Sequence, residues 1–265
     1  MYSTLIWKEV KNLIRKFRVS FEPRPKIWIG DYSTKNSEPT RETGIIGSLR
    51  WWYESVIRGL GGYACDPTLT AGKCGADNLC DVCKFFGCTG WARKFRLTVS
   101  RNNNEFLMEF IELREILDIE LGLLNKTLQI IEKYGSLGGK IAESNYGIIK
   151  ITENEFRNYK IHYDKLESYL EKNKSNNKEF PAIDNFFFVM KSYAQLSKKL
   201  KDKIPSLKGK KGERAKRYFS KSIDNTFNRF FTYAISDDEY IKIKHFFEKE
   251  NIEFITGMSI LEAKK

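Results

Sequence analysis

Five cysteines lie within residues 65–88, and they are the residues of this chain best suited to bind a metal ion. Their spacing is Cys65-x8-Cys74-x5-Cys80-x2-Cys83-x4-Cys88. Two thiolates separated by two residues can hold one Zn²⁺ at about 2.3 Å, and clustered cysteines without signs of secretion are more often metal ligands than disulfides. We predict a structural zinc site with the ligands Cys65, Cys74, Cys80 and Cys83. Reduced thiols without a metal are the alternative, and Cys88 competes with Cys65 for the fourth position.

A basic and aromatic segment begins a predicted helix over residues 48–60. The N-terminal amides of a helix attract anions, and Arg41 and Arg50 lie on either side of this helix end. Trp51 and Arg58 lie off the apolar face of the helix, and Trp51 is available to stack on a base of single-stranded nucleic acid. The alternative is that Trp51 and Trp52 both pack in the core and that the arginines are solvated.

A second glycine-rich segment spans residues 135–147 and contains Gly138, Gly139 and Lys140. It follows a predicted helix and precedes a predicted strand, so it is neither a P-loop nor a dinucleotide-binding turn. Glycines here allow the backbone to lie against a nucleic-acid strand. A helix end followed by a long turn is the alternative.

Candidates for acid–base or hydrolytic chemistry are few. His162 and His245 are the only two histidines, and neither has a sequence neighbour that indicates a catalytic pair. Asp31 lies in a proline-containing connection over residues 22–43 and is the best single carboxylate for metal-assisted cleavage of a phosphodiester. We therefore expect a protein without catalytic activity, with Asp31 as the residue on which an alternative nuclease function depends.

The elements that must position these residues follow an alternating order. Hydrophobic periodicity predicts strands over residues 13–21, 94–100, 106–113 and 148–152, and helices over 48–60 and 116–134. The order strand, helix, strand, strand, helix, strand is that of the ferredoxin-like fold. We therefore predict an α+β domain over residues 1–152, with an antiparallel four-stranded sheet, two helices on one face and a cysteine-rich insertion at about residues 61–92.

The remaining residues, 153–265, have a different pattern. Helices are predicted over residues 163–173, 183–203, 212–231 and 240–250, followed by one strand over 252–260. This region is therefore expected to be mainly helical, with a short strand. The many lysines between residues 198 and 221 form either a solvated face or a patch that contacts RNA.

The excess of positive charge in the composition indicates what kind of partner the protein has. The 265 residues contain 46 Lys and Arg against 34 Asp and Glu, which gives a net charge of +12. Such an excess favours a polyanionic partner, because phosphates attract cations and binding releases counterions. No apolar run approaches the roughly 20 residues needed to span a bilayer, and the N-terminal residues lack a signal-peptide core. We expect a cytoplasmic protein without a membrane partner.

Together, these motifs resemble a known family. A strand and a proline-containing loop precede the helix Gly47-Ser-Leu-Arg-Trp-Trp52, which is similar to a "G-x-L-R-x-W" motif. Cys80-x2-Cys83-Lys-Phe-Phe-Gly87 and the strand Trp91-Ala-Arg-Lys-Phe-Arg96 follow, and the glycine-rich loop comes later. In this order the chain resembles the RAMP superfamily of CRISPR effector proteins over about residues 13–152. Within it, the likeness is to the first-named RAMP subunit of the type III-B (Cmr) module.

This resemblance implies an RRM-related core that binds RNA. It implies a non-catalytic subunit that caps one end of the effector backbone near the 3′ end of the guide RNA, holds guide and target RNA, and contacts other RAMP subunits in antiviral defence. A metal-dependent endoribonuclease using Asp31 is the alternative. The chain is short for two full RAMP folds, so residues 153–265 are expected to be a degenerate second half or a helical extension. The residues expected to contact RNA are Arg41, Arg50, Trp51, Arg58, Arg93, Gly138, Gly139 and Lys140.

Overall fold

The computed structural model describes residues 14–262, except for residues 25, 30–40, 67–73, 141–142, 171–179, 194, 211–214 and 223–227. Two four-stranded antiparallel sheets organise this part of the chain. None of its helices combines the length and the apolarity needed to cross a membrane.

The first sheet has the ferredoxin-like order expected from the sequence. Its elements are β1 (Lys16–Arg24), α2 (Glu42–Gly59), β2 (Phe95–Asn102), β3 (Glu105–Glu112), α4 (Asp118–Lys133) and β4 (Ile148–Asn154), and the strands are arranged β2-β3-β1-β4. Period-two alternation explains β1, in which Phe17, Val19 and Phe21 are buried while Lys16 and Arg18 are exposed. The predicted fold class is therefore confirmed.

The cysteine-rich segment is inserted between α2 and β2. It contains the short helix α3 (Asp81–Phe86), which Cys80 caps. Phe85 and Phe86 pack on Tyr53 of α2, with ring centroids 5.5 and 5.2 Å away. The insertion is therefore anchored to the core through one end of its own short helix.

The C-terminal region contains a second sheet that the sequence analysis did not predict. Its elements are β5 (Phe186–Val189), α6 (Leu196–Lys203), β6 (Tyr218–Ser222), β7 (Asn228–Tyr233), α7 (Asp237–Lys249) and β8 (Ile255–Thr256), and the strands are arranged β6-β7-β5-β8. The element order and the strand order both repeat those of the first sheet. Shorter elements complete the chain: η1 (Glu155–Asn158), α5 (Tyr163–Tyr169), η2 (Ile183–Asn185), η3 (Pro205–Leu207) and α8 (Gly257–Glu262).

The expectation of a mainly helical C-terminal region is therefore corrected. Residues 212–231 were expected to form a helix, but their described part contains β6 and most of β7. The expected helix over 183–203 is divided between β5 and α6, and the expected strand over 252–260 is reduced to β8, followed by α8. For β5 and β7 the reason is burial on both faces, which removes the alternation by which a strand is recognised, whereas β6 alternates between buried and half-buried positions.

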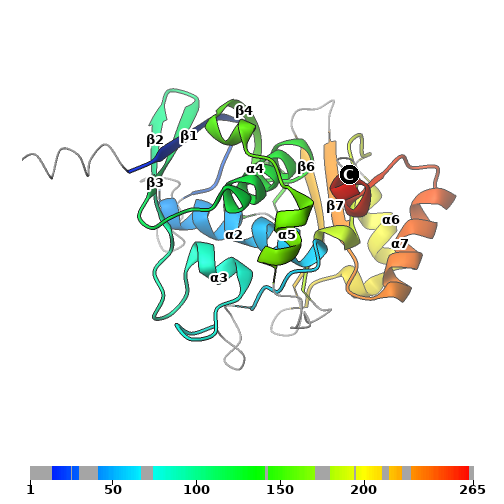
Figure 1. Ribbon diagram of the computed structural model, residues 1–265. Coiled ribbons are helices and arrows are strands. Elements are labelled where there is room, and N and C mark those ends of the chain that lie inside the picture. Colours follow the sequence, from blue (N-terminus) through cyan, green and yellow to red (C-terminus); the bar gives the residue numbers. More distant parts are fainter. Residues whose placement is uncertain are drawn as a thin grey trace, which may run out of the picture.

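The layers alternate between sheets and helices. In Figure 1, α2 and α4 lie between the two sheets, and α6 and α7 cover the far side of the second sheet. Trp52 of α2 packs on Phe186 of β5, with ring centroids 5.7 Å apart, whereas the adjacent Phe187 packs on Phe247 of α7 at 5.8 Å. All four side chains of β5 are consequently buried. This arrangement places the middle of α2, with Ser48 and Trp51, beside the glycine-rich loop and the edge strand β6.

Candidate metal centre and nucleic-acid interface

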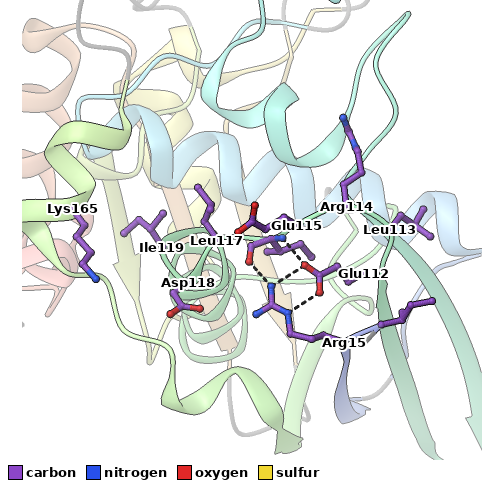
Figure 2. A pocket seen from close by; sticks show the side chains of 11 residues that line it. Arg15, Glu112, Leu113, Arg114, Glu115, Leu117, Asp118, Ile119 and Lys165 are labelled. Carbon is purple, nitrogen blue, oxygen red and sulfur yellow. Dashed lines mark hydrogen bonds and ion pairs between the residues drawn. The ribbon is translucent and has the colours of Figure 1, made fainter. Parts of the chain in front are cut away.

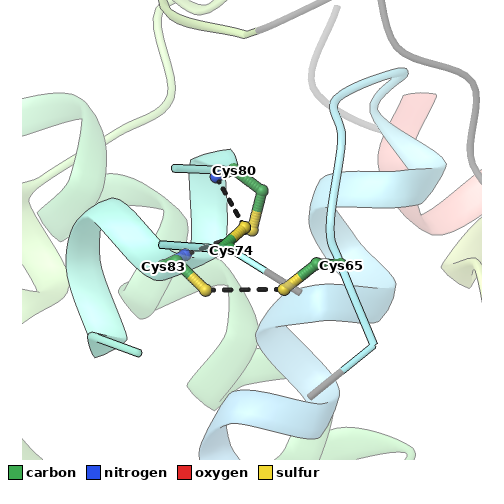
Figure 3. A group of neighbouring side chains, drawn as sticks. All are labelled: Cys65, Cys74, Cys80 and Cys83. Carbon is green, nitrogen blue, oxygen red and sulfur yellow. Dashed lines mark hydrogen bonds between the residues drawn. The ribbon is translucent and has the colours of Figure 1, made fainter. Parts of the chain in front are cut away.

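Four of the five cysteines form one buried cluster. The sulfur atoms of Cys65, Cys74, Cys80 and Cys83 all lie within 4.8 Å of one another (Figure 3). A tetrahedral ion with Zn–S bonds of about 2.3 Å requires sulfurs about 3.8 Å apart, and the Cys65 and Cys83 sulfurs are 3.5 Å apart. The cluster can therefore hold a metal ion. Cys88 stands outside it, with its thiol directed at the Thr89 carbonyl oxygen at 3.7 Å, so the competition between Cys65 and Cys88 is resolved in favour of Cys65.

Hydrogen bonds within the cluster favour a thiolate at Cys80, whereas burial and the neighbouring sulfurs raise the pKa of Cys65, Cys74 and Cys83. The Cys80 N–H donates to the Cys74 sulfur at 3.2 Å, and the Cys83 N–H donates to the Cys80 sulfur at 3.4 Å. Hydrogen bonds from the Cys65 and Cys83 thiols lower the pKa of Cys80. Amide and thiol donors that point at a sulfur stabilise its charged form, which is the form that binds metal.

Arg50 and Arg58 face this cluster rather than solvent. Arg50 donates to the Cys83 sulfur at 3.2 Å, to the Gly87 carbonyl at 2.7 Å and to the Glu54 carboxylate at 2.8 Å. Arg58 is 6% exposed and donates to the Pro181 and Ala64 carbonyls at 3.1 and 3.3 Å. The expectation that these two arginines contact RNA is therefore corrected. Their sequence positions predicted a polar helix face, but that face is covered by the insertion.

Ser48 and Trp51 of α2 border a cavity. Its volume is about 380 Å³, and it is lined by Ser48, Trp51, Gly138, Ala215, Lys216, Phe219 and Tyr233. Trp51 is half-buried, whereas the neighbouring Trp52 is fully buried in the core. The cavity therefore brings together two residues expected from the sequence, Trp51 and Gly138, with residues of the second sheet.

Four hydrogen bonds hold the glycine-rich loop in place beside this cavity. The Gly138 N–H donates to the Ser48 hydroxyl at 3.0 Å, and the Gly139 N–H donates to the Trp28 carbonyl at 2.8 Å. On the opposite side, the Lys221 ammonium of β6 donates to the carbonyls of Glu143 and Tyr146 at 2.8 and 2.9 Å. The loop is thus held by both halves of the molecule.

Lys140 is the exposed cation of this loop. Its backbone has a φ of +52°, and its ammonium lies 3.6 Å from the centroid of the Trp28 ring and 5.5 Å from that of Tyr146. Cation–π contacts of this kind hold an ammonium in place without neutralising it. Lys140 is therefore available as a positioned positive charge at the surface, with Glu143 3.9 Å away.

A methyl group at Gly138 is expected to disturb the loop. The residue has a φ of +93°, and a Cβ there would lie 2.6 Å from the Trp28 carbonyl oxygen. Gly138→Ala should lower the free energy of unfolding by about 1–3 kcal/mol. The cost of holding alanine at a positive φ adds to the cost of the close approach between its Cβ and the Trp28 carbonyl oxygen. Chemical denaturation measures this. Gly47→Ala is the control, since nothing lies within 4 Å of a Cβ there; equal losses in both variants would contradict the expected geometry.

The burial of Lys221 should make the stability of the protein depend on pH. Burial lowers its pKa from 10.5 to about 7, with a further contribution from the nearby Lys216 charge. Between these two values the unfolded state binds more protons than the folded state, so stability rises with pH. The free energy of unfolding of the wild type relative to Lys221→Met should therefore increase from pH 7 to pH 10. Lys242→Met is the control, because Lys242 is exposed: the free energy of unfolding of the wild type relative to Lys242→Met should not change between pH 7 and pH 10. If the difference for Lys221→Met does not change with pH either, the pKa of Lys221 is not lowered.

The remaining expected residues lie apart from the cavity or outside the described chain. Arg41 is exposed just before α2, and its N–H donates to the Ile29 carbonyl at 3.1 Å. Arg93 is half-buried in the segment that leads to β2, outside the residues that line the cavity. Asp31 falls outside the described residues. His162 and His245 lie before α5 and on α7, away from the cavity lining.

Several residues of this site were missed by the sequence analysis. Trp28 lies in the proline-containing connection over residues 22–43 and was given no role there, and Lys216, Phe219 and Tyr233 belong to segments that were predicted with the wrong type or without a role. The one signal that pointed to them was the density of lysines between residues 198 and 221. Lys216 and Lys201 in fact approach one aromatic ring, with ammonium groups 4.4 and 5.9 Å from the centroid of Tyr218.

The outer face of the first sheet does not offer an aromatic platform. The phenylalanines of β1 and β3 point into the core, and all are at most 6% exposed: Phe17, Phe21, Phe106 and Phe110. The opposite face of β1 carries Lys16 and Arg18, which pair with Glu109 of β3. RRM-type stacking on this sheet is therefore unavailable among the described residues, although the fold is RRM-related.

A second, larger hollow of the described surface contains a pair of opposite charges. It measures about 960 Å³ and lies between the start of β1 and the start of α4 (Figure 2). Arg15 donates to the Glu112 carboxylate at 2.7 and 2.8 Å, and this hydrogen bond lowers the pKa of Glu112. Its lining contains no histidine, cysteine or serine. We therefore place the candidate interface at the smaller cavity beside the glycine-rich loop.

Comparisons with known proteins agree with this fold. A family model described as the RAMP superfamily matches residues 24–150. The crystal structure of Cmr1 from Pyrococcus furiosus, in its apo form, matches 92% of this chain and 98% of that chain, with a TM-score of 0.53 and 12% sequence identity. No curated protein sequence matches the chain. At this identity the structural likeness concerns the fold, and it includes both sheets.

Proposed function

We propose, from the match of residues 24–150 to the RAMP superfamily model, that the protein is a non-catalytic RNA-binding subunit of a type III-B CRISPR effector ribonucleoprotein. Its partners in this proposal are guide RNA, target RNA and other RAMP subunits, with contacts near the 3′ end of the guide. The fold shared with Cmr1 supports the assignment to this module.

One observation carries the RNA-binding part of the proposal. The glycine-rich loop, with Lys140 exposed, and the segment before β6, with Lys216, lie on either side of one cavity that also contains Trp51. Cations bind phosphates without reading sequence, and aromatic rings stack on unpaired bases. A guide-binding subunit needs this combination, because it must hold RNAs of many sequences. The net charge of +12 adds long-range attraction.

A binding experiment with matched variants tests this proposal. Purified protein is titrated into end-labelled single-stranded RNA with Mg²⁺ or Mn²⁺ present, and each sample is run on a native and a denaturing gel. We expect shifted, intact RNA. The double variant Lys140→Glu/Lys216→Glu should bind at least about tenfold more weakly, since two phosphate contacts become repulsive. Lys242→Glu/Lys244→Glu on α7 changes the charge equally and should bind nearly as well as the wild type.

The same gels address the alternative. Cut RNA on the denaturing gel, lost in Asp31→Ala, would replace the non-catalytic role by a metal-dependent endoribonuclease. Wild-type protein that neither shifts nor cuts RNA at low salt would contradict the RNA-binding role of the isolated chain.

Two structural roles complete the proposal. The donor set of four buried cysteine sulfurs suits Zn²⁺, and a site closed by four thiolates is structural rather than catalytic. Residues 153–265 act as a second RAMP half, a role supported by the strand order that the second sheet shares with the first. On this basis each half contributes one side of the RNA-binding crevice.

A further inference from the structure

We infer that the cavity between α2 and β6 receives one unpaired nucleobase of the bound RNA. The inference rests on the proposed RNA-binding function and adds to it a discrete pocket for a single base. It follows from the juxtaposition of Trp51, Phe219 and Tyr233 with the Ser48 hydroxyl and the Lys216 side chain.

The walls of the cavity suit a flat aromatic ligand. Trp51 contributes an indole, and Phe219 and Tyr233 contribute rings from two adjacent strands of the second sheet. The volume of about 380 Å³ lies at the lower end of the range typical of small-ligand sites, roughly 300–1,000 Å³. Such a space accommodates one base with part of its ribose, but not a stacked pair together with the backbone.

Trp51 is positioned as a wall rather than as part of the core. Three rings support it in edge-on contacts: Trp52 at 4.8 Å, Phe186 at 6.0 Å and Tyr233 at 6.3 Å between centroids. These contacts fix the indole while leaving it half-buried. A rotamer fixed in this way loses little entropy when a ligand stacks on it.

Polar groups are placed to meet the edge of a base. The Ser48 hydroxyl accepts the Gly138 N–H at 3.0 Å and therefore retains its own O–H for donation. Bases present carbonyl oxygens and ring nitrogens as acceptors on their edges. Because one hydroxyl donor can meet any of these acceptors, the pocket should take purines and pyrimidines alike.

The surrounding charges fit a nucleotide rather than an uncharged ligand. Lys216 lines the cavity, and Lys140 stands two residues beyond Gly138, which forms the opposite wall. A strand that runs between these two lysines has a phosphate on each side of the mouth. The bases of such a strand are unpaired and can turn inward.

RNA with and without bases provides the test. Two fluorescein-labelled 12-mers of equal length are compared by fluorescence anisotropy at one salt concentration: oligouridylate and the corresponding abasic ribose-phosphate chain. Wild-type protein should bind the uridine 12-mer about tenfold more tightly, as expected for one stacked base. Trp51→Ala should reduce this preference to about one while leaving the affinity for the abasic chain unchanged, and Trp51→Phe should keep most of it.

A control and the opposing outcomes separate this inference from the proposed function. Trp91→Ala removes a half-buried tryptophan outside the cavity and should keep the wild-type preference. Equal wild-type affinity for both 12-mers would overturn the base pocket and leave RNA binding intact, as would a preference that survives in Trp51→Ala. Failure to bind either 12-mer would refute the proposed function itself. Near-ultraviolet circular dichroism checks that Trp51→Ala is still folded like the wild type. If its spectrum changes by more than the loss of one indole, the same comparison of the two 12-mers is made with Phe219→Ala.

Discussion

Substituting Cys80 by serine is expected to abolish zinc binding at the proposed four-cysteine site and to lower the melting temperature by about 10 °C or more. Structural zinc sites contribute on the order of 10 kcal/mol of apparent binding free energy, and a loss of several kcal/mol in a protein of this size corresponds to about 2–4 °C for each kcal/mol. Cys80 both caps α3 and accepts the Cys83 N–H through its sulfur, so its replacement affects the helix as well as the metal.

The measurement combines metal content and thermal unfolding. Elemental analysis of the purified wild type should give one zinc per chain, and a chelator should lower its melting temperature in the same way as the substitution. Cys88→Ser is the control, because the Cys88 thiol faces the Thr89 carbonyl and lies outside the cluster. Wild-type protein without zinc and with the same melting temperature as Cys80→Ser would show that the four thiols are simply reduced.

The four-cysteine cluster also indicates how the described part of the insertion is held together. Within the insertion, the Tyr63 N–H donates to Asp81 at 3.0 Å, and the Asp81 N–H donates to the Tyr63 carbonyl at 3.2 Å. A zinc ion bound by the four sulfurs would fix Cys65 and Cys74 relative to residues 80–83. Arg50 then connects the cluster to α2, because its guanidinium contacts the Cys83 sulfur.

The first sheet could be predicted from the sequence because water covers one of its faces. In β1, the buried Phe17, Val19 and Phe21 alternate with exposed or polar residues, which is the pattern of a half-buried strand. The strand β5 has no such pattern. Phe186 and Phe188 pack toward α2 and α4 while Phe187 packs toward α7, so all its positions are apolar. A run of this kind is ambiguous between a strand and a buried helix.

In the candidate site, too, the features that depend on nearby sequence positions could be predicted, and those that depend on distant positions could not. Cysteine spacing is local, so the four members of the cluster could be named in advance. The environment of Arg50 is not local, since its partners Cys83 and Gly87 lie more than 30 positions away. An arginine beside tryptophans in a basic chain predicted an RNA contact, and only the fold places it against thiols. Lys216 and Phe219 were missed because their element was predicted as a helix.

The second large effect is expected from Glu54→Ala, which should destabilise the protein by about 3–5 kcal/mol. The Glu54 carboxylate lies between two arginines, with Arg50 at 2.8 Å and Arg58 at 3.5 Å, and its side chain is 8% exposed. Removing one member of a buried ionic group leaves the others without compensation, and this costs more than the group contributed as a whole. Arg58 is the more affected partner, because burial already lowers its pKa.

Denaturant unfolding of three variants measures this effect. Asp238→Ala is the control, since its pair with Lys242 is exposed and should contribute less than about 1 kcal/mol. The double variant Glu54→Leu/Arg58→Met removes the carboxylate and its most buried partner together, and it should recover part of the stability lost in Glu54→Ala. If Glu54→Ala and Asp238→Ala lose equal stability, then Glu54, Arg50 and Arg58 are not buried in solution as they are in this structure.

A second substitution at this position, Glu54→Gln, decides between the two roles that α2 can give its arginines. Arg50 and Arg58 contact the cysteine-rich insertion, whereas Trp51 lines the cavity. Folded Glu54→Gln protein keeps the shape of this side chain and should therefore bind single-stranded RNA with wild-type affinity even though its stability is reduced. A tenfold change in RNA affinity without a loss of stability would mean that the arginines reach RNA. An effect on stability alone means that Arg50 and Arg58 hold the insertion while Trp51 stays available to the ligand.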